Sequence, residues 1–152
     1  MKCRECKAAM REATAEPARG TAGEVTTNLI DMPYMVCPQC GSTAFLHGEF
    51  PAEMLEHLSN HIPYATSKGF RTKEWSCNRC GARIEGAGPI VETFPVALST
   101  EGRAFRAELV LSAVRCGACG QAQVMANKRQ LESDMADSLI EAFKALGPIN
   151  RW

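Results

Sequence analysis

Apolar and polar residues alternate in two separate parts of the chain, and this two-residue period predicts β-strands. The first part, residues 24–36, is rich in β-branched residues, and Pro33 within it indicates a sheet edge or a bulge. The second part comprises residues 90–98 and 103–114, and the Ser-Thr-Glu-Gly segment between them predicts the turn of a β-hairpin. Residues 12–23 show no period, so we expect a loop or a loosely formed first strand there.

Each β arm is followed by a stretch in which apolar residues recur every three or four positions, which predicts an amphipathic helix. The first helix is expected over residues 51–61, where Pro51 suits the first turn and Pro63 ends the pattern. The second is expected over residues 128–146, with Asn127 as its N-cap. The apolar stripe of the second helix comprises Leu131, Met135, Leu139 and Phe143. Two interpretations stay open, because such a stripe either packs on its own ribbon or forms an anchor for a partner protein or a second copy of the chain.

All eight cysteines fall into four Cys-x-x-Cys pairs. The pairs are Cys3/Cys6, Cys37/Cys40, Cys77/Cys80 and Cys116/Cys119. Such a pair turns the backbone so that two sulfur atoms face one point, and two pairs complete the tetrahedron of thiolates that zinc prefers. We therefore expect two structural zinc ions, each held by four cysteines. Iron is the alternative metal, because rubredoxin-like electron carriers use similar four-thiolate sites.

The order of these features repeats once, which predicts a tandem duplication. Residues 1–62 would form a first zinc ribbon with a helix, and residues 63–152 a second zinc ribbon with the C-terminal helix. The expected fold class is small, metal-stabilised α+β, with tandem rubredoxin-like ribbons that each contain a β-hairpin arm and two Cys-x-x-Cys knuckles. The repeat favours joining of the first pair with the second and of the third with the fourth. An interleaved arrangement stays open, because loop length alone does not select the pairing.

Charge and composition narrow the classes of function. Seventeen basic and seventeen acidic residues cancel, and two zinc ions on eight thiolates would lower the net charge to about −4. A protein that binds nucleic acid through phosphates alone carries a positive excess, which this sequence lacks. Neither an export signal nor an apolar run that could span a bilayer is evident, so we expect a cytoplasmic protein without membrane contact. In that reducing compartment the cysteines would bind metal rather than form disulfides.

A third metal site is a weaker hypothesis for the first helix. Glu53, His57 and His61 are spaced four apart, so they share one face of a helix and could hold a further ion. The alternative interpretation is an exposed polar face, which is the commoner origin of such spacing.

Basic residues around the second ribbon are interleaved with aromatic residues such as Phe70 and Trp75, which is typical of surfaces that bind nucleic acid. The basic residues concerned are Arg71, Lys73, Arg79, Arg83, Arg103 and Arg106. Acidic residues in the same segment and the negative charge of a zinc-thiolate centre oppose this interpretation. Nucleic acid is therefore the second candidate partner, after another protein.

The N-terminal segment resembles a known family. Two motifs carry the resemblance, Met1-Lys2-Cys3-x-x-Cys6 and Ile30-Asp31-Met32-Pro33-x-x-Val36-Cys37-Pro38-Gln39-Cys40-Gly41. Together with the strand and helix expected after them, they resemble the YgiT-type zinc ribbon of MqsA-like antitoxins over about residues 1–62. The resemblance implies zinc binding by the four cysteines of this segment and contact of the ribbon with a toxin protein. A helix-turn-helix domain that reads operator DNA normally follows in that family, whereas residues 63–152 predict a second ribbon here.

The catalytic motifs that a sequence can reveal do not stand out in this chain. We find neither a nucleophile beside a base, nor a phosphate-binding loop, nor a pair of carboxylates, so we expect no enzymatic activity. The sequence favours a non-catalytic double zinc-ribbon protein that binds another protein, as an antitoxin-like or immunity-like inhibitor or as an adaptor. The alternative is a nucleic-acid-binding transcription or accessory factor, and the second alternative is a rubredoxin-like iron electron carrier.

Overall fold

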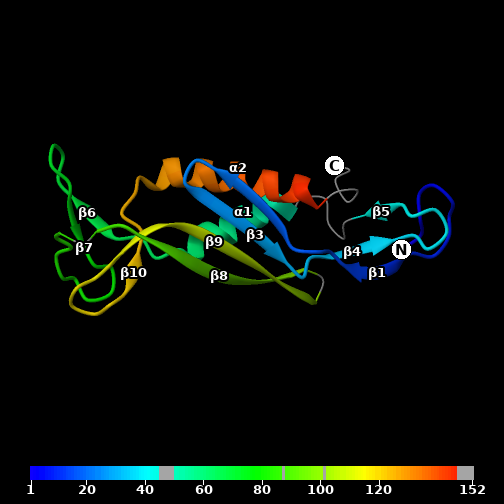
Figure 1. The fold of residues 1–152 in the computed structure, drawn as a ribbon, viewed down its shortest axis with the longest axis horizontal. Coiled ribbons are helices and arrows are strands. Elements are labelled where there is room, and N and C mark those ends of the chain that lie inside the picture. The colour runs from blue at the N-terminus through cyan, green and yellow to red at the C-terminus, as the bar shows by residue number, and fades with distance from the viewer. Residues whose placement is uncertain (45–49, 87, 101, 147–152) are drawn as a thin grey trace.

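The protein is elongated, with a twisted central sheet and a smaller group of strands at each end (Figure 1). This architecture comes from a computed structural model that describes residues 1–44, 50–86, 88–100 and 102–146. The elements in chain order are β1 (Arg11–Thr14), β2 (Ala18–Ala22), β3 (Val25–Ile30), β4 (Pro33–Val36), β5 (Thr43–Ala44), α1 (Phe50–His61), β6 (Thr66–Lys68), β7 (Glu74–Ser76), β8 (Ile90–Thr100), β9 (Arg103–Arg115), β10 (Ala122–Gln123) and α2 (Lys128–Ala145).

The central sheet is antiparallel and contains strands from both halves of the sequence. Its order is β10-β9-β3-β2, and β8 also pairs with β9. The join between the halves is the pairing of β3 with β9, in which Thr27 lies opposite Leu109. A three-stranded sheet, β1-β4-β5, forms one end of the molecule, and the β6-β7 hairpin belongs to the other. The sheet thus crosses the boundary that the sequence suggested between residues 62 and 63.

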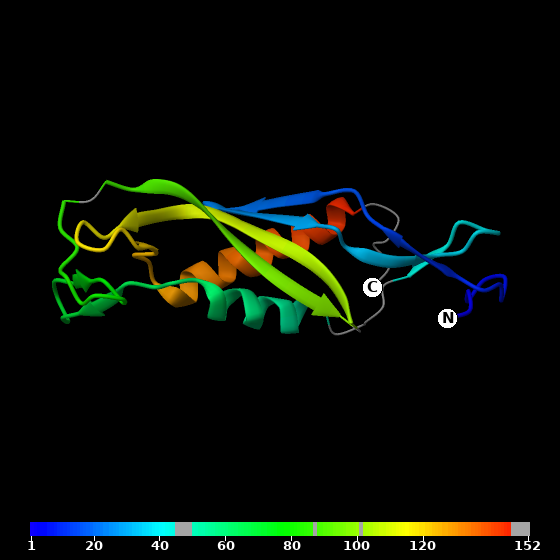
Figure 2. The ribbon, with the colours of Figure 1, turned by 90° about the horizontal axis from the view of Figure 1, so that it is seen from below.

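Both helices lie on the same face of the central sheet (Figure 2). Helix α2 packs mainly on β2 and β3 from the first half of the chain, whereas α1 lies beside α2 and contacts β8 from the second half. Each helix therefore covers the arm of the other half. The helix boundaries agree closely with the expected ones, and Asn127 caps α2 by accepting hydrogen bonds from the backbone N–H groups of Arg129 and Gln130.

The apolar stripe of α2 is not an exposed partner anchor. Its side chains are buried in the main core of this chain; they are Leu131, Met135, Leu139 and Phe143. They pack there with residues of the first half such as Leu29 and Leu58. The other interpretation, that this stripe packs on its own ribbon, was also incomplete, because α2 packs mainly on β2 and β3 of the first half.

The main core is shared by both halves of the chain, which tandem, separate ribbons would not have. The buried cluster contains Leu29 and Leu58 from the first half and Leu109 and Phe143 from the second. Pooling the apolar residues of both halves gives a larger core than either half could bury alone. The central sheet therefore has a substantial apolar interior of its own, whereas the sequence predicted small ribbons stabilised mainly by metal.

Strands β1 and β2 occupy most of the segment in which apolar and polar residues show no period. The reason is visible at Gly20, on β2, where an added Cβ atom would lie 2.1 Å from both the N atom of Ala142 and the O atom of Ser138. Strand and helix backbones approach so closely that only glycine fits. Small residues therefore stand where a strand usually has β-branched ones, which hides the strand from a propensity argument.

The second arm matches its prediction well. Strands β8 and β9 form the expected hairpin, and Phe105, Leu109 and Leu111 on β9 are buried in the main core. Pro95 lies on β8, which pairs only with β9 among the described strands, so it stands on a sheet edge as expected. None of the described helices is long and apolar enough to cross a membrane.

Candidate metal centres

The four Cys-x-x-Cys pairs adopt the same local turn. In each, the residue after the second cysteine donates its backbone N–H to the carbonyl of the first cysteine, at 2.8 to 3.0 Å. That residue has a positive φ, which glycine adopts without strain, and it is Gly41, Gly81 or Gly120 in three of the turns. Lys7 takes the position in the first turn with φ 64°. The turn is therefore encoded locally, mostly by a glycine after the pair.

The turns bring the sulfur atoms together in two groups of four. The first group comprises Cys3, Cys6, Cys37 and Cys40, and the second Cys77, Cys80, Cys116 and Cys119. Within each group all Sγ atoms lie within 4.8 Å of one another. The pairing is first with second and third with fourth, and the interleaved alternative is excluded. The local repeat thus predicted the pairing of the knuckles correctly.

The sulfur spacing suits a tetrahedral metal ion. Sγ atoms from different pairs are 3.3 Å apart for Cys6 and Cys37 and 3.6 Å apart for Cys77 and Cys119. A tetrahedron with metal–sulfur bonds of about 2.3 Å has edges of about 3.8 Å, so the sulfur atoms would only have to move apart by a few tenths of an ångström around an ion. Four thiolates of this spacing fit zinc or iron, and they leave no coordination position for a substrate. Both groups can therefore hold a structural metal ion.

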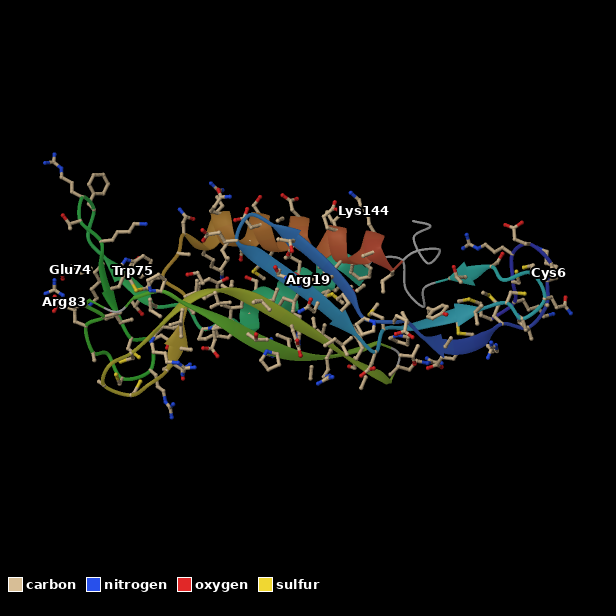
Figure 3. All side chains as sticks on the ribbon, in the orientation of Figure 1. Cys6, Arg19, Glu74, Trp75, Arg83 and Lys144 are labelled. Atoms are coloured by element: carbon tan, nitrogen blue, oxygen red, sulfur yellow. The ribbon has the colours of Figure 1, made fainter. Side chains whose placement is uncertain are left out.

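The two groups lie at opposite ends of the molecule. Cys6, in the first group, is at the end formed by β1, β4 and β5, and Glu74 and Arg83 mark the end that carries the second group (Figure 3). In every pair the first cysteine is buried and the second is exposed. A bound ion would therefore have protein on one side and be near solvent on the other.

Backbone N–H groups favour the thiolate form of the buried cysteines. The pKa of Cys3, Cys37 and Cys116 is lowered, and the largest cause is the backbone N–H of the second cysteine in the same pair. Hydrogen bonds from N–H groups stabilise negative charge on sulfur, and a metal ligand must be deprotonated. The turn that gathers the sulfur atoms thus also prepares three of them to bind metal.

Gln123 distinguishes the second group from the first. Its fully buried side chain donates from Nε2 to Sγ of Cys77 at 3.1 Å, and its Oε1 accepts from the backbone N–H of Asn78 at 2.9 Å. This contact is the main reason why the pKa of Cys77 is lowered to about 6. The corresponding position in the first ribbon, four residues after the last cysteine, is Ala44. Sequence reasoning missed Gln123, because nothing local shows that β10 turns this side chain toward the sulfur.

The proposed third metal site is not formed. Among the described residues, the only groups of three or more potential ligands close enough to share an ion are the two cysteine groups. The rings of His57 and His61 are close, with centres 4.1 Å apart and planes tilted by 39°, but Nδ1 of His61 is 2.8 Å from the carbonyl oxygen of His57. This contact occupies one ring nitrogen. The four-residue spacing therefore reflects a shared helix face rather than a metal site.

The six basic residues suggested for nucleic acid do not share one surface. Arg83 forms ion pairs with Glu74 and Glu85, and Arg103 pairs with Glu12 from the first half of the chain. Arg103 begins β9 and Arg106 follows on it, roughly 30 to 40 Å along the strand from the second cysteine group. Arg79 lies in the turn between Cys77 and Cys80. Arg71 and Lys73 lie in the exposed loop that joins β6 to β7, at the same end of the molecule as Arg83.

Comparisons with known proteins add no relative. No protein family, no curated protein and no solved structure matches this chain. The geometry supports two metal-binding cysteine groups in a small α+β protein, and the resemblance to the antitoxin ribbon stays a prediction.

Proposed function

We propose that the protein is a non-catalytic scaffold with two structural zinc ions, which binds another protein along the edge strand β8. Such a role covers the antitoxin-like or immunity-like inhibitor and the adaptor that the sequence favours. The observation that carries this proposal is that one long side of β8 pairs with no strand among the described residues. Zinc at the two cysteine groups would hold the ends of the sheet in place by cross-linking their turns, without taking part in a reaction.

Strand β8 has the properties of a surface to which another strand can be added. It pairs with β9 on one side, and no described strand pairs with its other side. Alternate side chains along it are exposed and uncharged; they are Val91, Thr93, Pro95, Ala97 and Ser99. Val91 is 78% exposed. Natural sheets usually protect a long edge with charged residues, because free backbone groups pair readily with another chain.

The opposite edge of the sheet, strand β2, is better protected against pairing with another chain. Strand β2 is less than half as long as β8 and carries the exposed cation Arg19 as its second residue (Figure 3). The only charged residue of β8, Glu92, is held by Arg115 on β9 at 2.7 Å. An extended segment of a partner could therefore pair with β8 without burying a free charge. This is the recognition mode in which main-chain hydrogen bonds give affinity.

The test compares partner binding by edge variants. A protein that copurifies with the full chain from native host extract is identified, purified and titrated against the wild type and the Val91→Lys/Thr93→Lys double variant. We expect the double variant to bind at least tenfold more weakly, because the lysines would bring unpaired charges to the new strand pair. Ser133→Lys, on the exposed face of α2, is the matched control and should bind normally. Equal binding by the double variant and the control, or the absence of any copurifying protein, would reject the proposal.

Metal identity requires a separate measurement. Elemental analysis of protein purified from the native host should give two zinc ions per chain. Two iron ions with thiolate charge-transfer absorption would instead support the electron-carrier alternative.

A further inference from the structure

A hollow beside the second cysteine group combines aromatic and cationic side chains. It has a volume of about 440 Å³ and lies between the β6-β7 hairpin and the start of α2. Its lining includes two aromatic residues, Tyr64 and Trp75, and two lysines, Lys73 and Lys128. No Asp or Glu is among the residues that line it. We propose that this hollow and the adjoining tip of the hairpin bind single-stranded nucleic acid.

The aromatic groups offer surfaces on which bases can stack. Phe70, at the tip of the hairpin, is 101% exposed, more than any other large apolar side chain described. Trp75 packs against a small cluster that includes Ala65 and Ile84, so its indole is fixed while it lines the hollow. Aromatic rings with an accessible face bind bases of any sequence by stacking.

Positive charges lie between the two stacking surfaces. Arg71 and Lys73 stand between Phe70 and Trp75 in the sequence, and both are exposed. On the other wall, Nζ of Lys128 is 5.6 Å from the centre of the Tyr64 ring and 3.8 Å from a carboxylate oxygen of Glu132. A strand with one base on each aromatic residue would place the intervening phosphate near these cations. This alternation of stacking and charge favours nucleic acid over an acidic peptide, which offers charge without bases.

The β6-β7 hairpin keeps its acidic residue, Glu74, on the side away from the lysine-lined hollow. Side chains alternate across a strand, so Lys73 and Trp75 face the hollow while Glu74 points the other way. Glu74 forms an ion pair with Arg83 at 3.4 Å, on the outer side of the hairpin (Figure 3). Lys68 is opposite Glu74 in the register and shares that outer side. The near-zero charge of the whole chain therefore hides a local cationic face.

The test measures binding of fluorescein-labelled oligodeoxythymidine and oligouridine of about ten nucleotides to the zinc-loaded full chain by fluorescence anisotropy. We expect saturable binding of at least one of them. Because three cations are involved, the logarithm of affinity should fall with the logarithm of salt concentration with a slope of about −2. Phe70→Ala should weaken binding about fivefold or more through loss of stacking. Lys73→Ser should also weaken binding and should make the salt slope less steep.

Lys68→Ser is the matched control, since it removes the same charge from the other side of the same hairpin. It should change affinity less than twofold. The absence of saturable binding at low salt, an equal loss in Lys68→Ser and Lys73→Ser, or unchanged affinity in Phe70→Ala would overturn the inference. So would binding to phosphatidylserine vesicles without binding to either oligonucleotide. Because this surface is separate from β8, these results are independent of the protein-partner test.

Discussion

The side-chain amide of Gln123 donates a hydrogen bond to Sγ of Cys77 over 3.1 Å, inside a site where every polar atom of the glutamine has a partner. Gln123 is 0% exposed, and it comes from β10, at a distance of 46 residues in the sequence from Cys77. The first cysteine group has Ala44 at the equivalent place and receives no such bond from it. The two metal sites, alike in their ligands, therefore differ in the groups that support those ligands.

Removal of the glutamine amide should weaken the second metal site selectively. Partners that hydrogen-bond to a metal ligand typically change metal affinity by about 10 to 100-fold. We expect Gln123→Ala to lose one zinc ion to a chelator more easily than the wild type does. The chelator concentration required should be lower by a factor of about ten or more. The measurement is chelator competition followed by absorbance, with cobalt substitution to count the occupied sites.

Gln121→Ala is the control for that prediction, because only the backbone of Gln121 takes part in the described hydrogen bonds around the site. Its chelator curve should match that of the wild type. Loss of affinity at both sites, or at neither, in the Gln123 variant would contradict the supporting role of the amide.

Loss of one outer cysteine should release one ion and disorder one end of the molecule. Cys40→Ser removes a ligand of the first group, and Cys119→Ser one of the second. Each variant should bind one zinc ion instead of two. Because the shared core lies between the sites, the central sheet should persist, and hydrogen exchange should rise mainly near the affected group. Global unfolding of either variant would show that the core depends on metal after all.

A methyl group at Gly20 should separate strand β2 from helix α2. The added Cβ atom would lie 2.1 Å from backbone atoms of the helix, and backbone cannot rotate away as a side chain can. We expect Gly20→Ala to lower the free energy of unfolding by about 1 to 3 kcal/mol or more. Gly88→Ala is the control, since nothing lies within 4 Å of its added Cβ and its effect should stay below about 0.5 kcal/mol. Urea denaturation of the zinc-loaded proteins measures both, and equal stability of the two variants would be inconsistent with the close strand–helix contact.

A buried pair of hydroxyl groups joins the two halves and allows their coupling to be measured. Oγ1 of Thr27, on β3, is 2.7 Å from Oγ of Ser138 on α2. Ser138 donates its proton to the carbonyl of Met135, so Thr27 must be the donor of the shared bond. Thr27→Val and Ser138→Ala should each lower stability by about 1 kcal/mol, and the double variant should lose less than the sum of the two. Denaturation should show a single transition in each protein. Additive losses, or two separate transitions, would indicate halves that fold independently.

Much of the local structure could be predicted from residues close together in the sequence. The Cys-x-x-Cys turns depend on a bond that spans four residues and on a residue with positive φ, which is glycine in three of the four. The helix boundaries follow from apolar spacing and from the cap at Asn127. The hairpin of β8 and β9 follows from its alternation and its turn. In each case the stabilising contacts join residues of one element or one turn, so they can be predicted from residues that are close together in the sequence.

By itself, then, the sequence determined the four cysteine turns, both helices and the second arm, and its repeat favoured the joining of neighbouring cysteine pairs. The tertiary structure alone decided that β3 pairs with β9, that each helix covers the arm of the other half, and that Gln123 reaches Cys77. The physical reason is that backbone groups at a strand edge are the same in every residue, so the choice of a partner strand leaves little trace in the sequence. Only the packing of the complete core selects it, and that same packing decides which apolar and cationic side chains stay exposed.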